Sequence, residues 1–113
     1  MDLNLLVIRS AIPKQMTEFY ALLGMVFEYH RHGNGPFHFS AQTGPTVLEI
    51  YPLAKRQDRC DKHLRLGLKI DLFAATIEKL QQQGVHFQHP PTTTEWGIMA
   101  VVEDPEGRKT RAL

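Results

Sequence analysis

Charged and polar side chains alternate with apolar ones in three segments of the sequence, and these side chains could do chemistry. Glu49 and Tyr51 alternate with aliphatic residues in segment 47–51. Basic residues occupy the alternating positions of two later segments: Arg65, Lys69, Lys109 and Arg111. A carboxylate can bind a metal ion or act as a base, whereas guanidinium groups bind carboxylates and phosphates through paired hydrogen bonds. The alternation predicts strands with one face toward a core and the other toward a ligand or solvent.

Six histidines raise the question of a metal site. His30 and His38 lie in neighbouring predicted strands, and with Glu28 or Glu49 they could form a nonstandard site if the hairpin register brings them together. That register depends on pairing between strands, so it does not follow from the sequence. We expect the histidines to be residues of the surface or of a site's rim, without a metal.

The overall composition is that of one globular domain. The chain has 113 residues, of which 42% are hydrophobic and 22% charged, and its net charge of +1 provides no field for nucleic acid. The apolar run at residues 5–8 is too short for a signal peptide or a membrane span, so we expect a cytoplasmic protein. The single cysteine, Cys60, has no partner for an intrachain disulfide and is expected to be a surface thiol.

The first half of the chain predicts a strand, a helix and three further strands. Apolar residues recur every three or four positions between 12 and 23, which is the period of a helix with one buried face. Ser10 can cap its start, Pro13 suits its first turn, and Gly24 can end it. The strands are expected at 3–9, 25–31, 36–42 and 46–52, with turns at 32–35 and 43–45.

The second half repeats this order after a polar connector at 54–63. Asp71 is expected to cap a second helix, and Gly84 to end it as Gly24 ends the first. The strands are expected at 64–70, 85–88, 98–103 and 108–113, with a tight turn at 104–107 and a surface loop at 90–95. Modules 1–53 and 64–113 are each too small to bury a sheet face easily, so the sequence predicts one domain over 1–113.

Five short motifs support a family assignment. They are, in chain order, Phe19 before Leu-Leu-Gly at 22–24, Glu49 in Val-Leu-Glu-Ile at 47–50, Ile-Asp at 70–71, Trp96 with Gly97, and Val-Glu-Asp-Pro-Glu-Gly at 102–107. In this order the chain resembles the vicinal-oxygen-chelate superfamily, the glyoxalase, bleomycin-resistance and extradiol-dioxygenase group. The resemblance implies an α+β fold of two βαβββ modules, whose curled mixed sheets form a cup with helices on the convex face. It also implies a ligand on the concave face and, in many members, a homodimer.

The resemblance places the alternating polar residues in the cup. The fourth strand would contribute Glu49 and Tyr51, the fifth Arg65 and Lys69, and the last Lys109 and Arg111. Three aromatic residues could pack the body of a ligand: Phe37, Phe39 and Trp96. These nine residues are the predicted ligand site.

The usual metal-ligand set of the family is mostly missing. Metal-dependent members place a His or Glu on each of four strands, and only Glu49 fits, because the matching positions hold Asn4 or Leu3, Arg65 and Arg111. A guanidinium about 4 Å from a divalent ion costs roughly 8 kcal/mol at an effective dielectric constant of about 20. We therefore expect no cofactor and no metal, and an anion between the two arginines. The alternative is an internal ion-pair plug that binds nothing.

Three functions follow as alternatives. The first is a metal-free protein of the drug-resistance type that binds or sequesters a small, anionic molecule in a composite pocket of a dimer, with neither nucleic acid nor a membrane as a partner. The second is an enzyme, a glyoxalase-like lyase or isomerase or a dioxygenase-related protein, with Glu49 as a weak candidate base. Two neighbouring arginines would make Glu49 a poorer base, which disfavours this alternative. The third is a structural or regulatory dimer with an unused cup.

Overall fold

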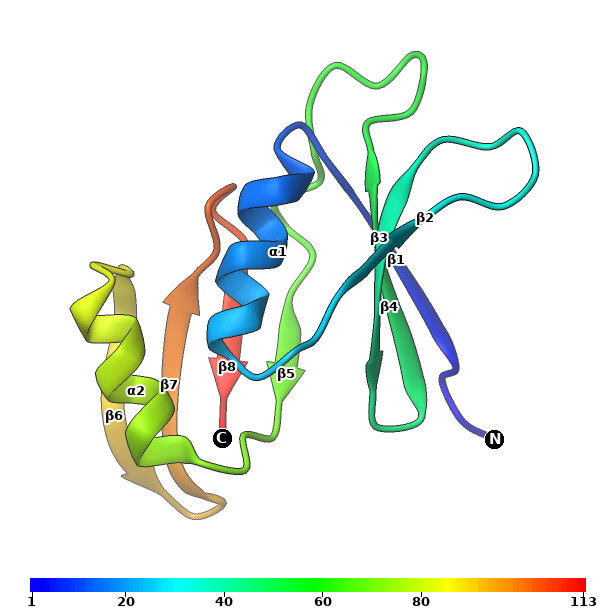
Figure 1. The fold of residues 1–113 in the computed structure, drawn as a ribbon. Coiled ribbons are helices and arrows are strands. Elements are labelled where there is room, and N and C mark those ends of the chain that lie inside the picture. Colours follow the sequence, from blue (N-terminus) through cyan, green and yellow to red (C-terminus); the bar gives the residue numbers. More distant parts are fainter. The chain divides into compact units, whose positions relative to one another are not determined.

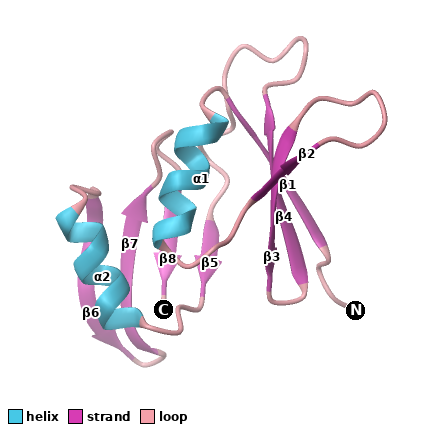
Figure 2. Ribbon diagram, in the orientation of Figure 1, coloured by secondary structure: helices cyan, strands magenta, loops and turns pink.

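The computed structural model describes all 113 residues as two units with the same strand order (Figure 1). The first unit comprises residues 1–21 and 25–60, and the second comprises residues 22–24 and 61–113. Each unit contains four strands and one helix (Figure 2). The exception is Leu22, the last residue of the first helix, which is grouped with the second unit. The sheet orders are β1-β4-β3-β2 and β5-β8-β7-β6, which confirms the predicted α+β fold of two βαβββ modules.

The first sheet consists of β1 (Leu5–Ser10), β2 (Glu28–His30), β3 (His38–Thr43) and β4 (Thr46–Pro52). β1 runs parallel to β4, and the other neighbours are antiparallel. The predicted strands at 25–31 and 36–42 are shortened, because the connection between them turns at residues 32–35. In that turn the amide of Gly35 donates to the carbonyl of His32 at 3.0 Å.

The first helix, α1 (Pro13–Leu22), begins and ends as its sequence predicts. The hydroxyl of Ser10 accepts a hydrogen bond from the amide of Ile12 at 2.9 Å. At the other end Gly24 has a φ of 108°, and the amide of Met25 donates to the carbonyl of Tyr20 at 3.2 Å. A positive φ suits glycine because it has no Cβ, so the helix stop is encoded locally.

The second helix, α2 (Phe73–Gln82), repeats that ending but not the predicted start. Gly84 has a φ of 73°, and the amide of Val85 donates to the carbonyl of Leu80 at 3.0 Å. The expectation that Asp71 caps the helix is wrong, because the N-cap residue is Leu72 and no side chain caps it. Neither helix is long and apolar enough to cross a membrane.

The second sheet consists of β5 (Leu66–Leu68), β6 (Phe87–Thr94), β7 (Gly97–Glu103) and β8 (Lys109–Ala112). The predicted loop at 90–95 is wrong, since β6 continues to Thr94 and pairs with β7. Its register shifts between Phe87 and Thr92, where two prolines lack the amide that a regular ladder needs. β5 is shorter than predicted, so Arg65 lies just outside it.

The predicted turn at 104–107 is confirmed, and it surrounds a buried ion pair that the sequence analysis missed. The amide of Gly107 donates to the carbonyl of Asp104 at 2.9 Å, and the Asp104 carboxylate accepts the amides of Glu106 and Arg108 at 2.8 and 3.0 Å. Nη1 of Arg108 lies 3.4 Å from Asp104 Oδ2 and 3.1 Å from Glu106 Oε1. The Arg108 side chain is 1% exposed and that of Asp104 is 0% exposed, so this pair ties β7 to β8 in the interior.

Replacing Arg108 should therefore destabilise the fold strongly. Arg108→Ala removes the buried guanidinium that lies 3.4 Å from the Asp104 carboxylate, and we expect the free energy of unfolding to fall by about 3–5 kcal/mol in a denaturant titration. The control is Arg59→Ala, because Arg59 forms an exposed ion pair with Asp58. That variant should match the wild type within about 0.5 kcal/mol. Equal stability of both variants would contradict a structural role for the buried pair.

Candidate functional site

Polar side chains from four neighbouring strands form a row on one face of the first sheet. Arg9 is opposite Tyr51 in the β1–β4 pair, and His30 is opposite His38 in the β2–β3 pair. The rings of His38 and Tyr51 stack with centroids 4.2 Å apart and an interplanar angle of 7°. The guanidinium carbon of Arg9 lies 4.8 Å from the Tyr51 ring centroid, and its Nη1 donates to the carbonyl of Pro52 at 3.3 Å. The row positions the His38 ring.

Glu49 shares this face because it lies two residues before Tyr51 in β4. It is 8% exposed, which is unusual for a carboxylate. Its Oε2 lies 3.1 Å from Nε2 of His38 and 3.7 Å from Nε2 of His32. The partners of Glu49 within the first unit are therefore imidazoles.

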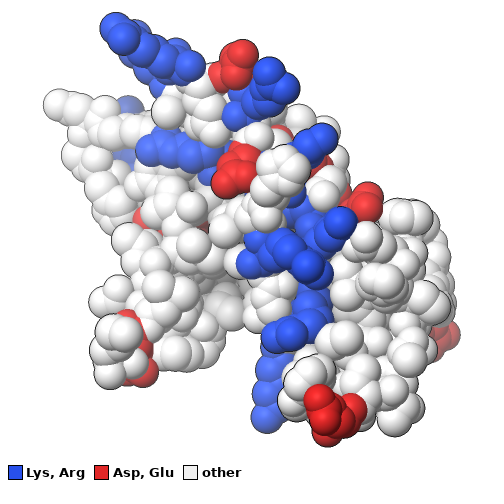
Figure 3. Space-filling view, turned by 180° about the vertical axis from the view of Figure 1, so that it is seen from behind, with Lys and Arg blue, Asp and Glu red and all other residues white.

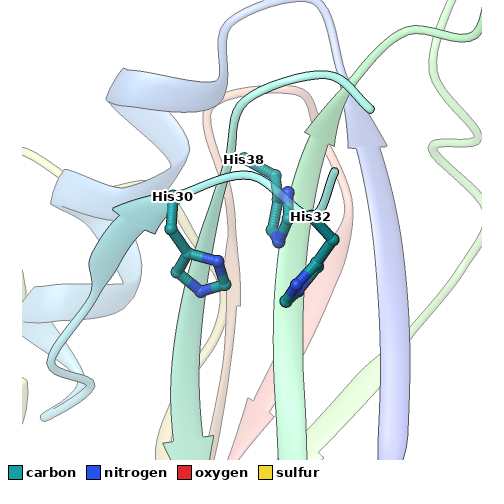
Figure 4. Close-up of side chains that lie close together, drawn as sticks. All are labelled: His30, His32 and His38. Carbon is teal, nitrogen blue, oxygen red and sulfur yellow. The ribbon is translucent and has the colours of Figure 1, made fainter. Parts of the chain in front are cut away.

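Three histidines gather around this carboxylate (Figure 4). One nitrogen from each of His30, His32 and His38 lies within 4.8 Å of the others. The expectation of surface or rim histidines is wrong for His38, which is 1% exposed, whereas the His32 side chain is 69% exposed. His32 was missed by the sequence analysis, although its spacing of two residues from His30 is the signal that both can face the same way.

The predicted arginines lie on the second unit. Arg65 and Arg111 are both exposed. Arg111 is opposite Gly67, and its guanidinium lies close to that glycine. A Cβ atom added to Gly67 would lie only 3.1 Å from Nη2 of Arg111. Trp96 lies in the turn between β6 and β7 and is 68% exposed. Lys69 is exposed and Lys109 half-buried.

The predicted aromatic residues of the first unit lie on the other face of its sheet. Phe39 is opposite Ile50 and Tyr29, whereas Glu49 is opposite Ser40, so Phe39 and Glu49 point to opposite sides. The Tyr29 ring lies 4.6 Å from that of Phe39 and 5.1 Å from that of Phe37, measured between centroids.

These three rings line an open pocket of about 680 Å³. The remaining lining residues are Pro13, Lys14 and Pro52. Tyr29 is 60% exposed and Phe37 48% exposed, so the rings offer apolar area to a ligand. Tyr29 was not among the predicted site residues. It precedes His30 in the strand predicted at 25–31, so its side chain is expected on the opposite face of the sheet from that of His30.

Comparisons with known proteins agree with this fold. A family profile described as the glyoxalase/bleomycin resistance protein/dioxygenase superfamily matches residues 3–110. The chain therefore belongs to this superfamily, as its motifs indicate. No curated protein gives a significant match.

Several solved structures share the fold over nearly the whole chain. TnmS3, an antibiotic-binding protein from Streptomyces sp. CB03234, has a TM-score of 0.78 and 22% identity, covering 99% of this chain and 93% of its own. A glyoxalase/bleomycin resistance protein from the same organism has a TM-score of 0.76 and 22% identity over 98% of both chains. An integron cassette protein from the mobile metagenome of V. cholerae has a TM-score of 0.70 and 20% identity, covering 99% and 93%.

The divalent metal of the superfamily's metal-dependent members does not fit the corresponding residues of this chain. Of the positions that the motifs predict to match the usual ligands, Glu49 supplies a carboxylate, Arg65 and Arg111 carry exposed guanidinium groups, and the first-strand residue is Asn4 or Leu3, both exposed. A guanidinium does not lose its proton in proteins and cannot ligate a cation.

Proposed function

We propose that the protein binds a small molecule that has a planar aromatic body and an acidic group, in the aromatic pocket of the first unit. The observation that carries this proposal is the pocket of about 680 Å³ lined by Tyr29, Phe37 and Phe39. Binding sites for small molecules are typically concave and apolar, with few polar groups, and this volume lies within their usual range of roughly 300–1,000 Å³.

The geometry of the rings favours a flat ligand. Tyr29 and Phe37 are nearly parallel, with an interplanar angle of 17°, so an aromatic plane can lie against both of them. Two cations favour an acidic group on that ligand. Lys14 belongs to the lining, and the guanidinium carbon of Arg31 lies 4.8 Å from the centroid of the Phe37 ring.

The proposed activity is sequestration rather than turnover. One structural relative is described as an antibiotic-binding protein, which supports binding of a small molecule in this fold. A glyoxalase-like or dioxygenase-like reaction is disfavoured, because the corresponding donor positions hold Arg65 and Arg111. Fold alone does not decide between these activities, so the proposal depends on the pocket.

Basic residues of the second unit are the second proposed contact for an anion. None of Arg65, Lys69, Lys109 and Arg111 forms an ion pair. Figure 3 shows Lys and Arg side chains that are exposed on one side of the molecule. We propose that these residues attract a carboxylate or phosphate, with Trp96 as an apolar contact.

We also propose a homodimer through the first sheet. β1 is an edge strand, and Leu5 and Val7 on its polar face are 48% and 39% exposed. Exposed apolar side chains on an edge strand favour association with another protein surface.

The aromatic pocket can be tested with 8-anilinonaphthalene-1-sulfonate, whose fluorescence reports binding. We expect Tyr29→Ala and Phe37→Ala to weaken its binding about tenfold each, or about 1.4 kcal/mol, because each removes a stacking surface. Lys14→Ala should weaken the sulfonate but leave the neutral analogue N-phenyl-1-naphthylamine unaffected. The control is Leu72→Ala, since Leu72 is 74% exposed and lies outside the pocket. Wild-type affinity in both aromatic variants would refute the pocket.

The basic residues can be tested with phthalate, an aromatic dicarboxylate, by calorimetry. Arg65→Ala and Arg111→Ala should each weaken its binding about tenfold, because each removes charge-assisted hydrogen bonds worth about 1.5–3 kcal/mol. The melting temperature should not change, since both side chains are exposed. Lys79→Ala, an exposed lysine of α2, is the control. A lower melting temperature with unchanged affinity would mean that the arginines are structural.

The dimer can be tested by light scattering during size-exclusion chromatography. The wild type should elute with twice the chain mass of 12.9 kDa, and Val7→Lys should shift it toward the monomer because it places a charge on the apolar edge. Val26→Lys is the matched control, as Val26 is 81% exposed and lies outside β1. A monomeric wild type would contradict the proposal.

A further inference from the structure

We propose that His30, His32 and His38, together with the carboxylate of Glu49, bind a zinc ion or another late first-row divalent metal. This donor set differs from the superfamily's usual one, with which it shares only Glu49. It also lies on the opposite face of the sheet from the aromatic pocket, so it does not depend on the proposed function. Three imidazoles and one carboxylate favour zinc, cobalt or nickel over magnesium or calcium, which prefer oxygen donors.

The separations between the donor atoms suit such an ion. Tetrahedral zinc with bonds of about 2.0–2.2 Å places its donors about 3.3–3.5 Å from one another. The two distances from Glu49 Oε2, 3.1 Å to His38 Nε2 and 3.7 Å to His32 Nε2, lie on either side of that value. The histidine nitrogens lie within 4.8 Å of one another, so side-chain rotations can bring them to this spacing.

His38 provides an independent observation that points to a cation. Its Nδ1 lies 3.3 Å from the carbonyl oxygen of Pro36, which suits donation of an Nδ1–H hydrogen bond. In that tautomer the buried Nε2 presents a lone pair to the region between the histidines and Glu49. Nε2 has no hydrogen-bond partner, although it lies only 3.1 Å from Glu49 Oε2.

In this tautomer two acceptors face each other at 3.1 Å, which is unfavourable unless a cation or a proton lies between them. A metal ion bound by both atoms satisfies them together, and a second proton on the His38 ring would satisfy them as an ion pair. These are the two outcomes that an experiment must separate. The converging rings of three histidines favour the metal, since an ion pair needs only one of them (Figure 4).

Of the proposed ligands, His38 is held firmly by its neighbours, whereas His32 is free to change its side-chain conformation. His38 is fixed by its stacking on Tyr51 and by the Pro36 carbonyl. His32 lies in the glycine-containing turn before β3, and its side chain is 69% exposed, so it can move to complete the site. Arg9, the cation of the same row, is held against Tyr51 and the carbonyl of Pro52, while Glu28 lies on this face two residues before His30.

The test uses untagged, full-length protein that has been freed of metal with a chelator. It is titrated with Co²⁺, whose intense visible absorption bands report tetrahedral coordination, and then with Zn²⁺, which should abolish those bands. We expect one ion per chain by elemental analysis. Zn²⁺ should also raise the melting temperature, because an ion that binds only the folded chain stabilises it.

His32→Gln is the decisive variant, because this side chain is exposed and its loss should not impair folding. We expect Co²⁺ and Zn²⁺ to bind at least about tenfold more weakly and the zinc-induced rise in melting temperature to shrink, while the metal-free melting temperature stays that of the wild type. His30→Gln should behave in the same way. The matched control is His89→Gln, since His89 is exposed on β6 and lies outside the cluster; it should bind metal as the wild type does.

Three results would overturn the proposal. Absence of the tetrahedral Co²⁺ bands would mean that the three histidines and Glu49 do not form this metal site. Equal metal affinity of His32→Gln and His89→Gln would mean adventitious binding at the surface. Loss of affinity in His30→Gln alone would mean a site other than the three-histidine one. Binding of the naphthalene probes reports the aromatic pocket separately, so failure of either proposal is distinguishable from failure of the other.

Discussion

The register between β3 and β4 is the constraint on which the chemistry of the first unit depends. Phe39 is opposite Ile50, and Ser40 is opposite Glu49, so neighbouring residues of each strand point to different sides. A slip of one residue would exchange the two faces, because side chains alternate with a period of two. It would place Glu49 among the aromatic rings. The pairing of β3 with β4 thus keeps Glu49 and the aromatic rings on opposite faces of the sheet.

Each face then has its own physical character. On the polar face, the nearly buried Glu49 carboxylate lies against the His38 imidazole. That ring stacks on Tyr51, and its Nδ1 lies within hydrogen-bond distance of the Pro36 carbonyl. Groups held this firmly give up little further freedom when an ion binds them. On the apolar face, exposed rings of Tyr29 and Phe37 retain area that a ligand can cover. The two proposed ligands therefore differ in chemistry because the two faces do.

The superfamily's fold is preserved although its usual donor set is not. Both units build the same strand order, and both helices end on a glycine with positive φ followed by an amide that reaches back into the last turn. The strand order and the helix ends depend on backbone geometry, so they can be retained when exposed side chains of the sheets change. The motifs predict Arg65 and Arg111 at positions that hold ligating residues in metal-dependent members, and such a difference would fit the general separation of fold from function.

The sequence by itself determined the duplicated plan, the helix stops at Gly24 and Gly84, the tight turn at 104–107 and the superfamily, because these depend on local periodicity and on residues that favour particular backbone angles. Only the tertiary structure decided that His32 joins His30, His38 and Glu49, that Phe39 lies away from Glu49, and that Arg108 is buried with Asp104. Such groupings need pairing between strands that are distant in the chain. Alternation fixes the faces within one strand, but it cannot say which face of the next strand lies beside it.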